Sequence, residues 1–248
     1  DSAAATILCV SGALPALESP RLRDLSRAYL AGAPLAGVVL PEVRLYQTVL
    51  DGAHLAGAAL VNAFAPGLRA RGADFAGATI TSGHFHHADL RGARLSGASA
   101  AGADFFRADL QDASLEGARF AGSTFDEARL DRAELTRADL TGVSLRETRL
   151  EGASLAGACL RNASISRVDL ARCDLRGVVL QGATLEASRL TGVELDELDA
   201  RESSFFACEL SGTSFRGADL RDCLFTRCLA HEAVFDGADL RGATFAEV

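Results

Sequence analysis

The chain has 248 residues and a net charge of −8, and all 25 of its basic residues are Arg. This acidic balance argues against a nucleic-acid ligand and favours an acidic surface that attracts a basic protein partner. No apolar run approaches about 18 residues, which argues against a transmembrane helix, and the first residues lack the basic start of a signal peptide. We therefore expect a cytoplasmic protein that makes no membrane contact.

Residues 1–22 stand apart because they do not follow the repeat that fills the rest of the chain. Residues 6–10 have the pattern of a short strand and residues 14–18 that of a single turn of helix. The terminal units of a repeat protein need a covering to stay soluble. The sequence therefore predicts an N-terminal cap over 1–22 and a repeat domain over 23–248.

From residue 23 onward the sequence repeats every five residues. The positions that are multiples of five, from Leu25 to Phe245, hold 28 Leu, 10 Phe, 2 Ile and 5 Ala without one insertion or deletion. Two residues before them, 25 of the 45 positions are Ala. A period of five fits neither the 3.6-residue helix nor the two-residue alternation of a strand. It fits a square coil in which each pentapeptide makes one side, so that four sides make a coil of 20 residues.

In such a coil the small residue and the Leu or Phe point inward, and the residue between them points outward by strand alternation. Successive coils stack at the spacing of parallel strands, about 4.8 Å. Glycine recurs at the second turn position, where a type II turn requires a positive φ. The repeat domain is long enough for about eleven such coils.

Residues 238–242 give the repeat in its full form, Ala-Asp-Leu-Arg-Gly. The pattern resembles the A(D/N)LXX consensus of the pentapeptide-repeat family over about nine-tenths of the chain. This resemblance implies an all-β fold, a right-handed quadrilateral parallel β-helix of about eleven coils.

The resemblance also implies a class of function, because members of this family act through their surfaces. Some resemble a rod of B-DNA in width and negative charge and bind type II topoisomerases; they include quinolone-resistance proteins and self-resistance proteins of antibiotic producers. The expected function is therefore a bacterial DNA mimic that binds DNA gyrase and protects it from inhibitors. The alternative is a structural or adaptor domain of a larger, secretion-associated bacterial protein, which a start at Asp1 without Met would fit.

Cysteine and histidine are the side chains that would bind a metal most readily. His84, His86 and His87 share one coil edge, but no carboxylate or Cys completes a ligand set within that coil. Four of the six cysteines replace Ala at the inward position, where a thiol acts as a small buried hydrophobe: Cys173, Cys208, Cys223 and Cys228. We expect no metal, no cofactor and no catalytic residue. Since an interior packed by Leu and Phe leaves no cleft for a substrate, the sequence predicts a protein that is not an enzyme.

Outward charges are distributed unevenly over the four faces of the coil. One face carries eight acidic residues against four arginines, a net charge of −4. The acids are Asp74, Glu116, Glu134, Asp174, Glu194, Asp196, Glu197 and Asp236, and the arginines are Arg94, Arg137, Arg176 and Arg216. We expect this acidic face to bind the partner by a charge attraction that salt weakens.

Large apolar side chains occupy outward positions in two places, and such patches mark surfaces that become covered. The first, the aromatic patch, is expected to be covered by residues 1–20 or by a partner; it contains Tyr46, Phe64, His86 and Phe106. The second lies in the C-terminal coils, where the outward residues Leu224, Leu229 and Val234 accompany three inward residues of the final coil that no further coil covers: Phe235, Leu240 and Phe245. An uncovered solenoid end would recruit other strands. The sequence therefore predicts a two-fold, end-to-end homodimer through the C-terminal coils.

Overall fold

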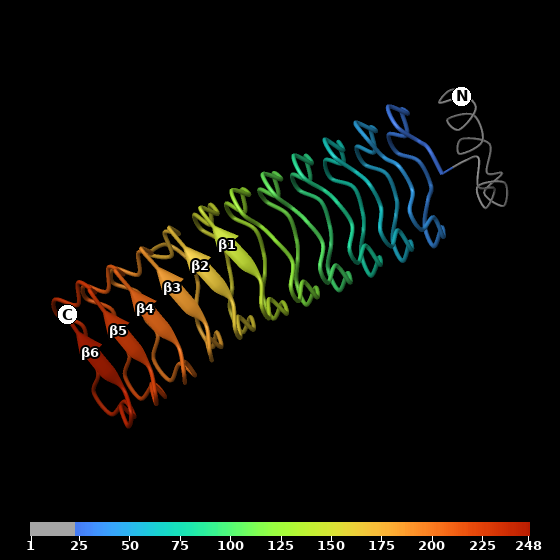
Figure 1. Ribbon diagram of the computed structural model, residues 1–248. Helices are drawn as coiled ribbons and strands as arrows, with labels where there is room; N and C mark the ends of the chain where they lie inside the picture. The colour runs from blue at the N-terminus through green and yellow to red at the C-terminus, as the bar shows by residue number, and fades with distance from the viewer. Residues whose placement is uncertain (1–22) are drawn as a thin grey trace.

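The structure, a computed structural model, describes residues 23–248 as one continuous rod of stacked coils (Figure 1). In this part of the chain every regular element is a β-strand or an isolated parallel bridge. No helix of the described residues is long and apolar enough to cross a membrane. The predicted N-terminal cap, residues 1–22, lies outside the described residues.

Six short strands lie side by side along one face of the rod (Figure 1). They are β1 (Ser144–Arg146), β2 (Ser164–Ser166), β3 (Thr184–Glu186), β4 (Ser204–Phe206), β5 (Leu224–Thr226) and β6 (Thr244–Ala246). They pair in parallel in chain order, and each residue pairs with one 20 positions further along, as Ser144 does with Ser164. Isolated parallel bridges continue the same 20-residue step back to Asp24. This register confirms the predicted all-β parallel solenoid.

The interior is filled by the side chains that the period of five assigns to it. Ala138 is 1% exposed, and a continuous buried cluster extends over residues 25–228. Phenylalanine rings stack along one face: the centroid of Phe105 lies 5.3 Å from that of Phe85 and 4.9 Å from that of Phe125. The rod is therefore held together by apolar contacts between successive coils as well as within each coil.

The corners of the coils hold the backbone in the left-handed region at the second turn position. Among the described residues, 22 glycines and 22 other residues have a positive φ. This conformation costs an ordinary L-residue about 1–2 kcal/mol, so other bonds have to fix it. At Arg27, where φ is 60°, the N–H donates to the carbonyl oxygen of Tyr46 on the next coil at 2.8 Å. The N–H of Ala28 closes the turn onto the carbonyl oxygen of Leu25 at 3.0 Å.

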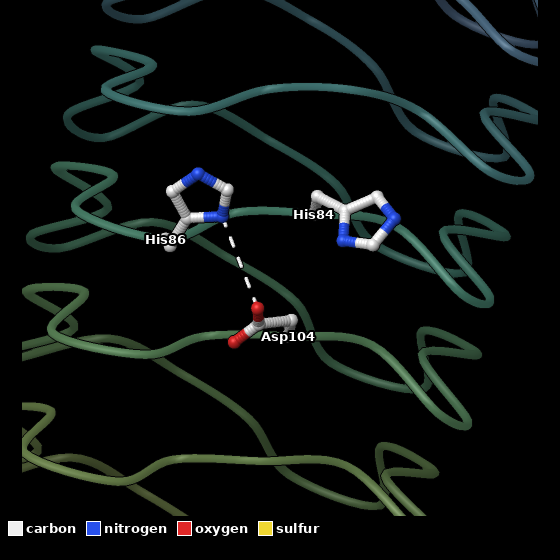
Figure 2. Close-up of side chains that lie close together, drawn as sticks. All are labelled: His84, His86 and Asp104. Atoms are coloured by element: carbon white, nitrogen blue, oxygen red, sulfur yellow. Dashed lines mark ion pairs between the residues drawn. The ribbon is translucent and has the colours of Figure 1, made fainter.

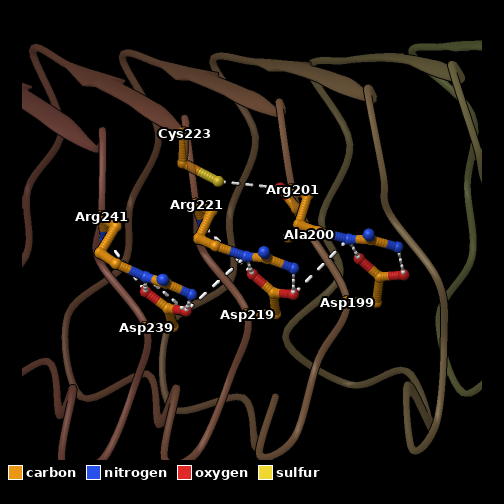
Figure 3. A network of polar contacts seen from close by, with 8 residues as sticks. All are labelled: Asp199, Ala200, Arg201, Asp219, Arg221, Cys223, Asp239 and Arg241. Carbon is orange, nitrogen blue, oxygen red and sulfur yellow. Dashed lines mark hydrogen bonds and ion pairs between the residues drawn. The ribbon is translucent and has the colours of Figure 1, made fainter.

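Another face carries a ladder of Asp–Arg pairs (Figure 3). Within a coil, the guanidinium of Arg221 donates hydrogen bonds of 2.8 and 2.6 Å to the carboxylate of Asp219. Between coils, Arg221 lies 3.6 Å from Asp239, and Arg201 lies 3.5 Å from Asp219. The hydrogen bonds from Arg241 lower the pKa of Asp239 to about 2. The charges of this face therefore neutralise one another, and little net charge remains to attract a partner.

Candidate functional site

The acidic face lies where the repeat places it. Asp74, Glu134 and Asp174 belong to one ladder of parallel bridges, and they are separated by whole 20-residue steps. Asp74 and Asp174 are half-buried, whereas the other six acids of this face are exposed. The stacking of coils thus gathers residues as far apart in the sequence as Asp74 and Asp236 into one long surface.

Half of these acids are neutralised by the arginines of the same face. Arg94 pairs with Asp74, Arg137 with Glu116, Arg176 with Asp174 and Arg216 with Asp236. The pairing is closest to bidentate at Asp174, whose carboxylate accepts hydrogen bonds of 2.8 and 2.7 Å from Arg176. These bonds lower the pKa of the Asp174 carboxyl. The net charge of the acidic face therefore comes from the acids that remain.

Most of the remaining charge lies on one coil. Within the described residues, no ion pair of this face reaches Glu134, Glu194, Asp196 or Glu197. Glu194, Asp196 and Glu197, hereafter the acidic edge, are all exposed. The hydroxyl of Ser214 donates a hydrogen bond to Asp196 and fixes its carboxylate on the surface. The acidic edge is thus the strongest uncompensated charge on this face.

The aromatic patch is partly exposed. Tyr46 and Phe64 are 37% and 39% exposed, and His86 and Phe106 are half-buried. The guanidinium of Arg107 lies 4.8 Å from the centroid of the Phe106 ring, within the range of a cation–π contact. The segment predicted to cover this patch lies outside the described residues, so that cover stays a prediction.

The histidine edge acquires a carboxylate that the sequence analysis did not assign to it. One nitrogen each of His84 and His86 and one carboxylate oxygen of Asp104 lie within 4.8 Å of one another (Figure 2). Asp104 follows His84 by 20 residues and is its parallel-bridge partner on the next coil. The sequence predicted an incomplete ligand set because only the coil that holds His84 was searched for a carboxylate. The missing carboxylate lies on the next coil. Aligning the sequence at a period of 20 is the signal that would have found Asp104.

Four of the five cysteines that the structure describes are free thiols that point into the rod. Cys208, Cys223 and Cys228 are buried, and Cys173 is half-buried. Burial raises the pKa of Cys173 to about 12 and that of Cys223 to about 11. A hydrogen bond between the stacked thiols raises the pKa of Cys208 and lowers that of Cys228. Their inward position is confirmed, and none of these four presents a thiolate on the exposed surface.

A solvent-open hollow of about 480 Å³ lies beside the coil corner that contains Asp131. Asp131 is 2% exposed, accepts a hydrogen bond of 2.8 Å from the side-chain amide of Gln111 and lies 3.4 Å from Arg149. Each arginine that lines the hollow forms an ion pair with an acid that also lines it. The pairs are Arg149–Asp131, Arg167–Glu147, Arg172–Glu151 and Arg189–Asp169. The hollow is therefore a closed set of ion pairs and offers no free charge to a ligand.

The C-terminal coils expose apolar side chains, as the sequence analysis expected. Leu229 is 65%, Phe245 43%, Leu224 42% and Leu240 37% exposed, while Val234 and Phe235 are half-buried. Leu229 and Val248 also line a shallow hollow at this end. We name this set of exposed and half-buried apolar residues the C-terminal rim.

The chain is similar to solved structures of several proteins. HetL from the cyanobacterium Nostoc sp. strain PCC 7120, a pentapeptide repeat protein involved in heterocyst differentiation regulation, is 24% identical, with 90% of this chain and 89% of HetL covered and a TM-score of 0.47. A trypsin-treated variant of QnrB1, a plasmid-mediated fluoroquinolone resistance protein, is 18% identical, with coverage of 88% and 86% and a TM-score of 0.39. Rfr23 from the cyanobacterium Cyanothece 51142 is 33% identical over 34% of this chain and 58% of its own, with a TM-score of 0.34.

No curated protein matches the chain in sequence. The family model for pentapeptide repeats matches in eight copies over residues 24–64, 67–97, 103–142, 133–170, 169–205 and 208–245, which is most of the chain. The matched residues are those that build the stacked coils and their buried Leu, Phe and Ala columns. By its sequence and by the coil that this sequence forms, the chain belongs to the pentapeptide-repeat family.

Proposed function

We propose that this protein is a non-enzymatic binding rod whose acidic face docks on the DNA-binding surface of a type II topoisomerase, DNA gyrase, and protects the enzyme from inhibitors. The observation that carries the proposal is the acidic edge, three exposed acids that, within the described residues, form no ion pair with an arginine of the same face. On the face of the Asp–Arg ladder, by contrast, Asp219 and Asp239 are bonded to arginines of their own coil.

Charge complementarity gives this proposal its physical basis. A protein that holds DNA presents Lys and Arg to the phosphates. Such a surface attracts a rigid partner that carries exposed carboxylates, and this attraction speeds the encounter and sets the orientation of docking. Because the coils stack at about 4.8 Å in a constant register, the acids of this face lie in neighbouring columns along the rod.

We propose a rod without catalytic activity because its core is packed and the charged groups around its surface hollow are already paired. The core is filled by apolar side chains, of which Phe105 and Leu130 are 0% and 1% exposed. The hollow beside the buried carboxylate of Asp131 is lined by arginines already paired with acids. A rod of this kind acts through what binds to its surface.

The test is a supercoiling assay with DNA gyrase, in the presence and absence of a fluoroquinolone, together with a direct measurement of binding. We expect the protein to bind gyrase, to preserve supercoiling in the presence of the drug, and to bind more weakly as salt rises. Changing Glu194, Asp196 and Glu197 together to Arg should weaken binding by at least about tenfold, because it reverses the acidic edge. The melting temperature should stay near that of the wild type because all three side chains are exposed.

A matched control separates local charge from net charge. Glu186, Glu202 and Asp222 are exposed acids on other faces, and their change to Arg alters the net charge of the chain by the same amount. This control should bind gyrase nearly as well as the wild type. Equal weakening by both triple variants would contradict the assignment to the acidic edge. A wild-type protein that binds no topoisomerase would leave the adaptor role as the better description.

We further propose that two copies join end to end through the C-terminal rim. The exposed Leu224 and Leu229 lie on neighbouring sides of one coil, and a second copy related by a two-fold axis presents the same residues and the same backbone edge. Light scattering at micromolar concentration should give twice the chain mass of 25.9 kDa. Changing Leu224 and Leu229 together to Asp should give monomers, since both are exposed and their loss leaves the core intact. The control is Val39→Asp, at a residue that is 60% exposed near the other end of the rod, and this variant should stay dimeric. A wild-type protein that has the mass of one chain in solution would contradict the dimer.

A further inference from the structure

We propose that His84, His86 and Asp104 form a zinc site that bridges two neighbouring coils. Two imidazoles and one carboxylate are a ligand set typical of Zn²⁺ sites that keep a fourth position for water. The three ligand atoms lie within 4.8 Å of one another (Figure 2). This site lies on the aromatic patch and shares no residue with the acidic face.

The backbone fixes where the three side chains emerge. His84 and His86 are two positions apart on one extended side of the coil, so both project outward. Asp104 is the parallel-bridge partner of His84 on the next coil. The N–H of Phe85 donates to the carbonyl oxygen of Asp104 at 2.7 Å, and the N–H of Asp104 donates to the carbonyl oxygen of Gly83 at 2.9 Å. These two bonds lock the register that brings the carboxylate to the imidazoles.

Asp104 is oriented before any metal binds. Its Oδ1 accepts a hydrogen bond of 2.9 Å from the N–H of Phe106, while its Oδ2 faces Nδ1 of His86 at 3.8 Å (Figure 2). A hydrogen bond to the second oxygen of a ligating carboxylate is the kind of outer contact that tunes metal affinity. The side chains of His86 and Asp104 are 32% and 38% exposed, so an ion reaches them without unfolding of the coil.

Small side-chain rotations suffice to bring the three ligand atoms to the distances that a bound Zn²⁺ requires. Tetrahedral Zn²⁺, with bonds of about 2.1 Å, separates its ligand atoms by about 3.4 Å. The distance from His86 to Asp104 is already 3.8 Å. Phe64 packs edge-on against both imidazoles, with centroid distances of 6.2 Å to His84 and 6.3 Å to His86, and so restricts the rings to this region.

The chemistry of the ligands selects the class of metal. Ca²⁺ requires six or more oxygen ligands, and Mg²⁺ prefers oxygen in a regular octahedron, so a site with two imidazole nitrogens suits neither. Imidazole suits Zn²⁺, and also Cu²⁺ and Ni²⁺, among the divalent ions. Zn²⁺ matches both the three-ligand set and the open fourth position.

The test is calorimetric titration of the untagged full-length chain with Zn²⁺ at neutral pH, in a Cys9→Ser background that removes the one thiol outside the repeat. We expect one ion per chain. His86→Asn and Asp104→Asn should each lower the affinity at least about tenfold. Asn at position 104 keeps an oxygen for the N–H of Phe106, so the coil should fold as before. Co²⁺ absorption in the visible range gives a second, spectroscopic measure of the same ligands.

Two matched variants control for histidine content. His87→Asn removes an imidazole whose ring lies 6.2 Å from that of His86 but outside the ligand set, and His54→Asn removes one on a different face. Both should bind Zn²⁺ like the parent, and Zn²⁺ should raise the melting temperature of the parent but not of Asp104→Asn. No binding at millimolar Zn²⁺, unchanged affinity in Asp104→Asn, or an equal loss in His87→Asn would each overturn the proposal.

Discussion

Replacing Ala138 by Leu is expected to lower the free energy of unfolding by about 3 kcal/mol, the upper end of the usual cost of overpacking a core. Ala138 is 1% exposed and stacks in one column with Ala118 and Ala158, one coil away on either side and both 0% exposed. The coils are about 4.8 Å apart, so the three added carbons meet the neighbouring coils directly. Moving them aside would break ladder bonds such as that from the N–H of Cys159 to the carbonyl oxygen of Ala138, at 2.9 Å.

Urea denaturation followed by circular dichroism measures this loss. Ala156→Leu is the control, because it makes the same chemical change at a half-buried outward position of a nearby turn. Its unfolding free energy should stay within about 0.5 kcal/mol of the wild type. If Ala138→Leu melted like Ala156→Leu, the Ala column would not line the axis of the rod.

The fold could be predicted from the sequence because the repeat is local and unbroken. A position such as Leu130 is assigned to the core by its place in the period alone, and it is 1% exposed. The period of 20 then fixes the parallel register, since residues such as Ser144 and Ser164 can pair only if each coil has four equal sides. Few folds allow so direct a step from sequence to long-range contacts.

The conformation of the corners could not be predicted in the same way. Glycine marked half of the left-handed positions, but Glu127 (φ 58°), Arg167 (φ 56°) and others adopt the same conformation without glycine. There the hydrogen bonds between coils, such as that from the N–H of Glu127 to the carbonyl oxygen of Arg146 at 2.7 Å, impose a backbone that the residue itself disfavours. Tertiary stacking therefore overrides local preference at these corners.

The candidate sites were predicted only in part, because their chemistry depends on contacts between coils. The sequence placed the acids on one face, but it did not separate Asp174, bonded to Arg176, from the unpaired Glu194. Likewise it grouped His84 with its neighbours in the chain and missed Asp104, its partner on the next coil. In both cases side-chain geometry across coils, rather than the period itself, decides what is free to bind.

Truncating Phe105 to Ala is expected to cost about 3–5 kcal/mol of unfolding free energy. The ring is 0% exposed, is stacked between Phe85 and Phe125 at 5.3 and 4.9 Å, and meets the edge of Phe120 at 5.8 Å. Removing it leaves a cavity in the middle of the rod that the coils above and below, fixed by their backbone ladders, cannot fill. Thermal and urea melts of the purified variant measure the loss.

Phe245 tests whether this cost comes from position in the rod rather than from the loss of a ring. It stacks on Phe225 at 4.8 Å much as Phe105 stacks on Phe125, but it is 43% exposed and lies in the terminal coil. In a solenoid each unit contacts only its neighbours, so an end unit loses about one interface where an internal unit loses two. With both variants made in the monomeric Leu224→Asp, Leu229→Asp background, Phe245→Ala should therefore cost less than half as much as Phe105→Ala. It should loosen the terminal coils alone, which hydrogen exchange would detect as faster exchange confined to β5 and β6. Equal losses for the two variants, or exchange that speeds up along the whole rod in Phe245→Ala, would show that the coils unfold as one unit and not through contacts between neighbours.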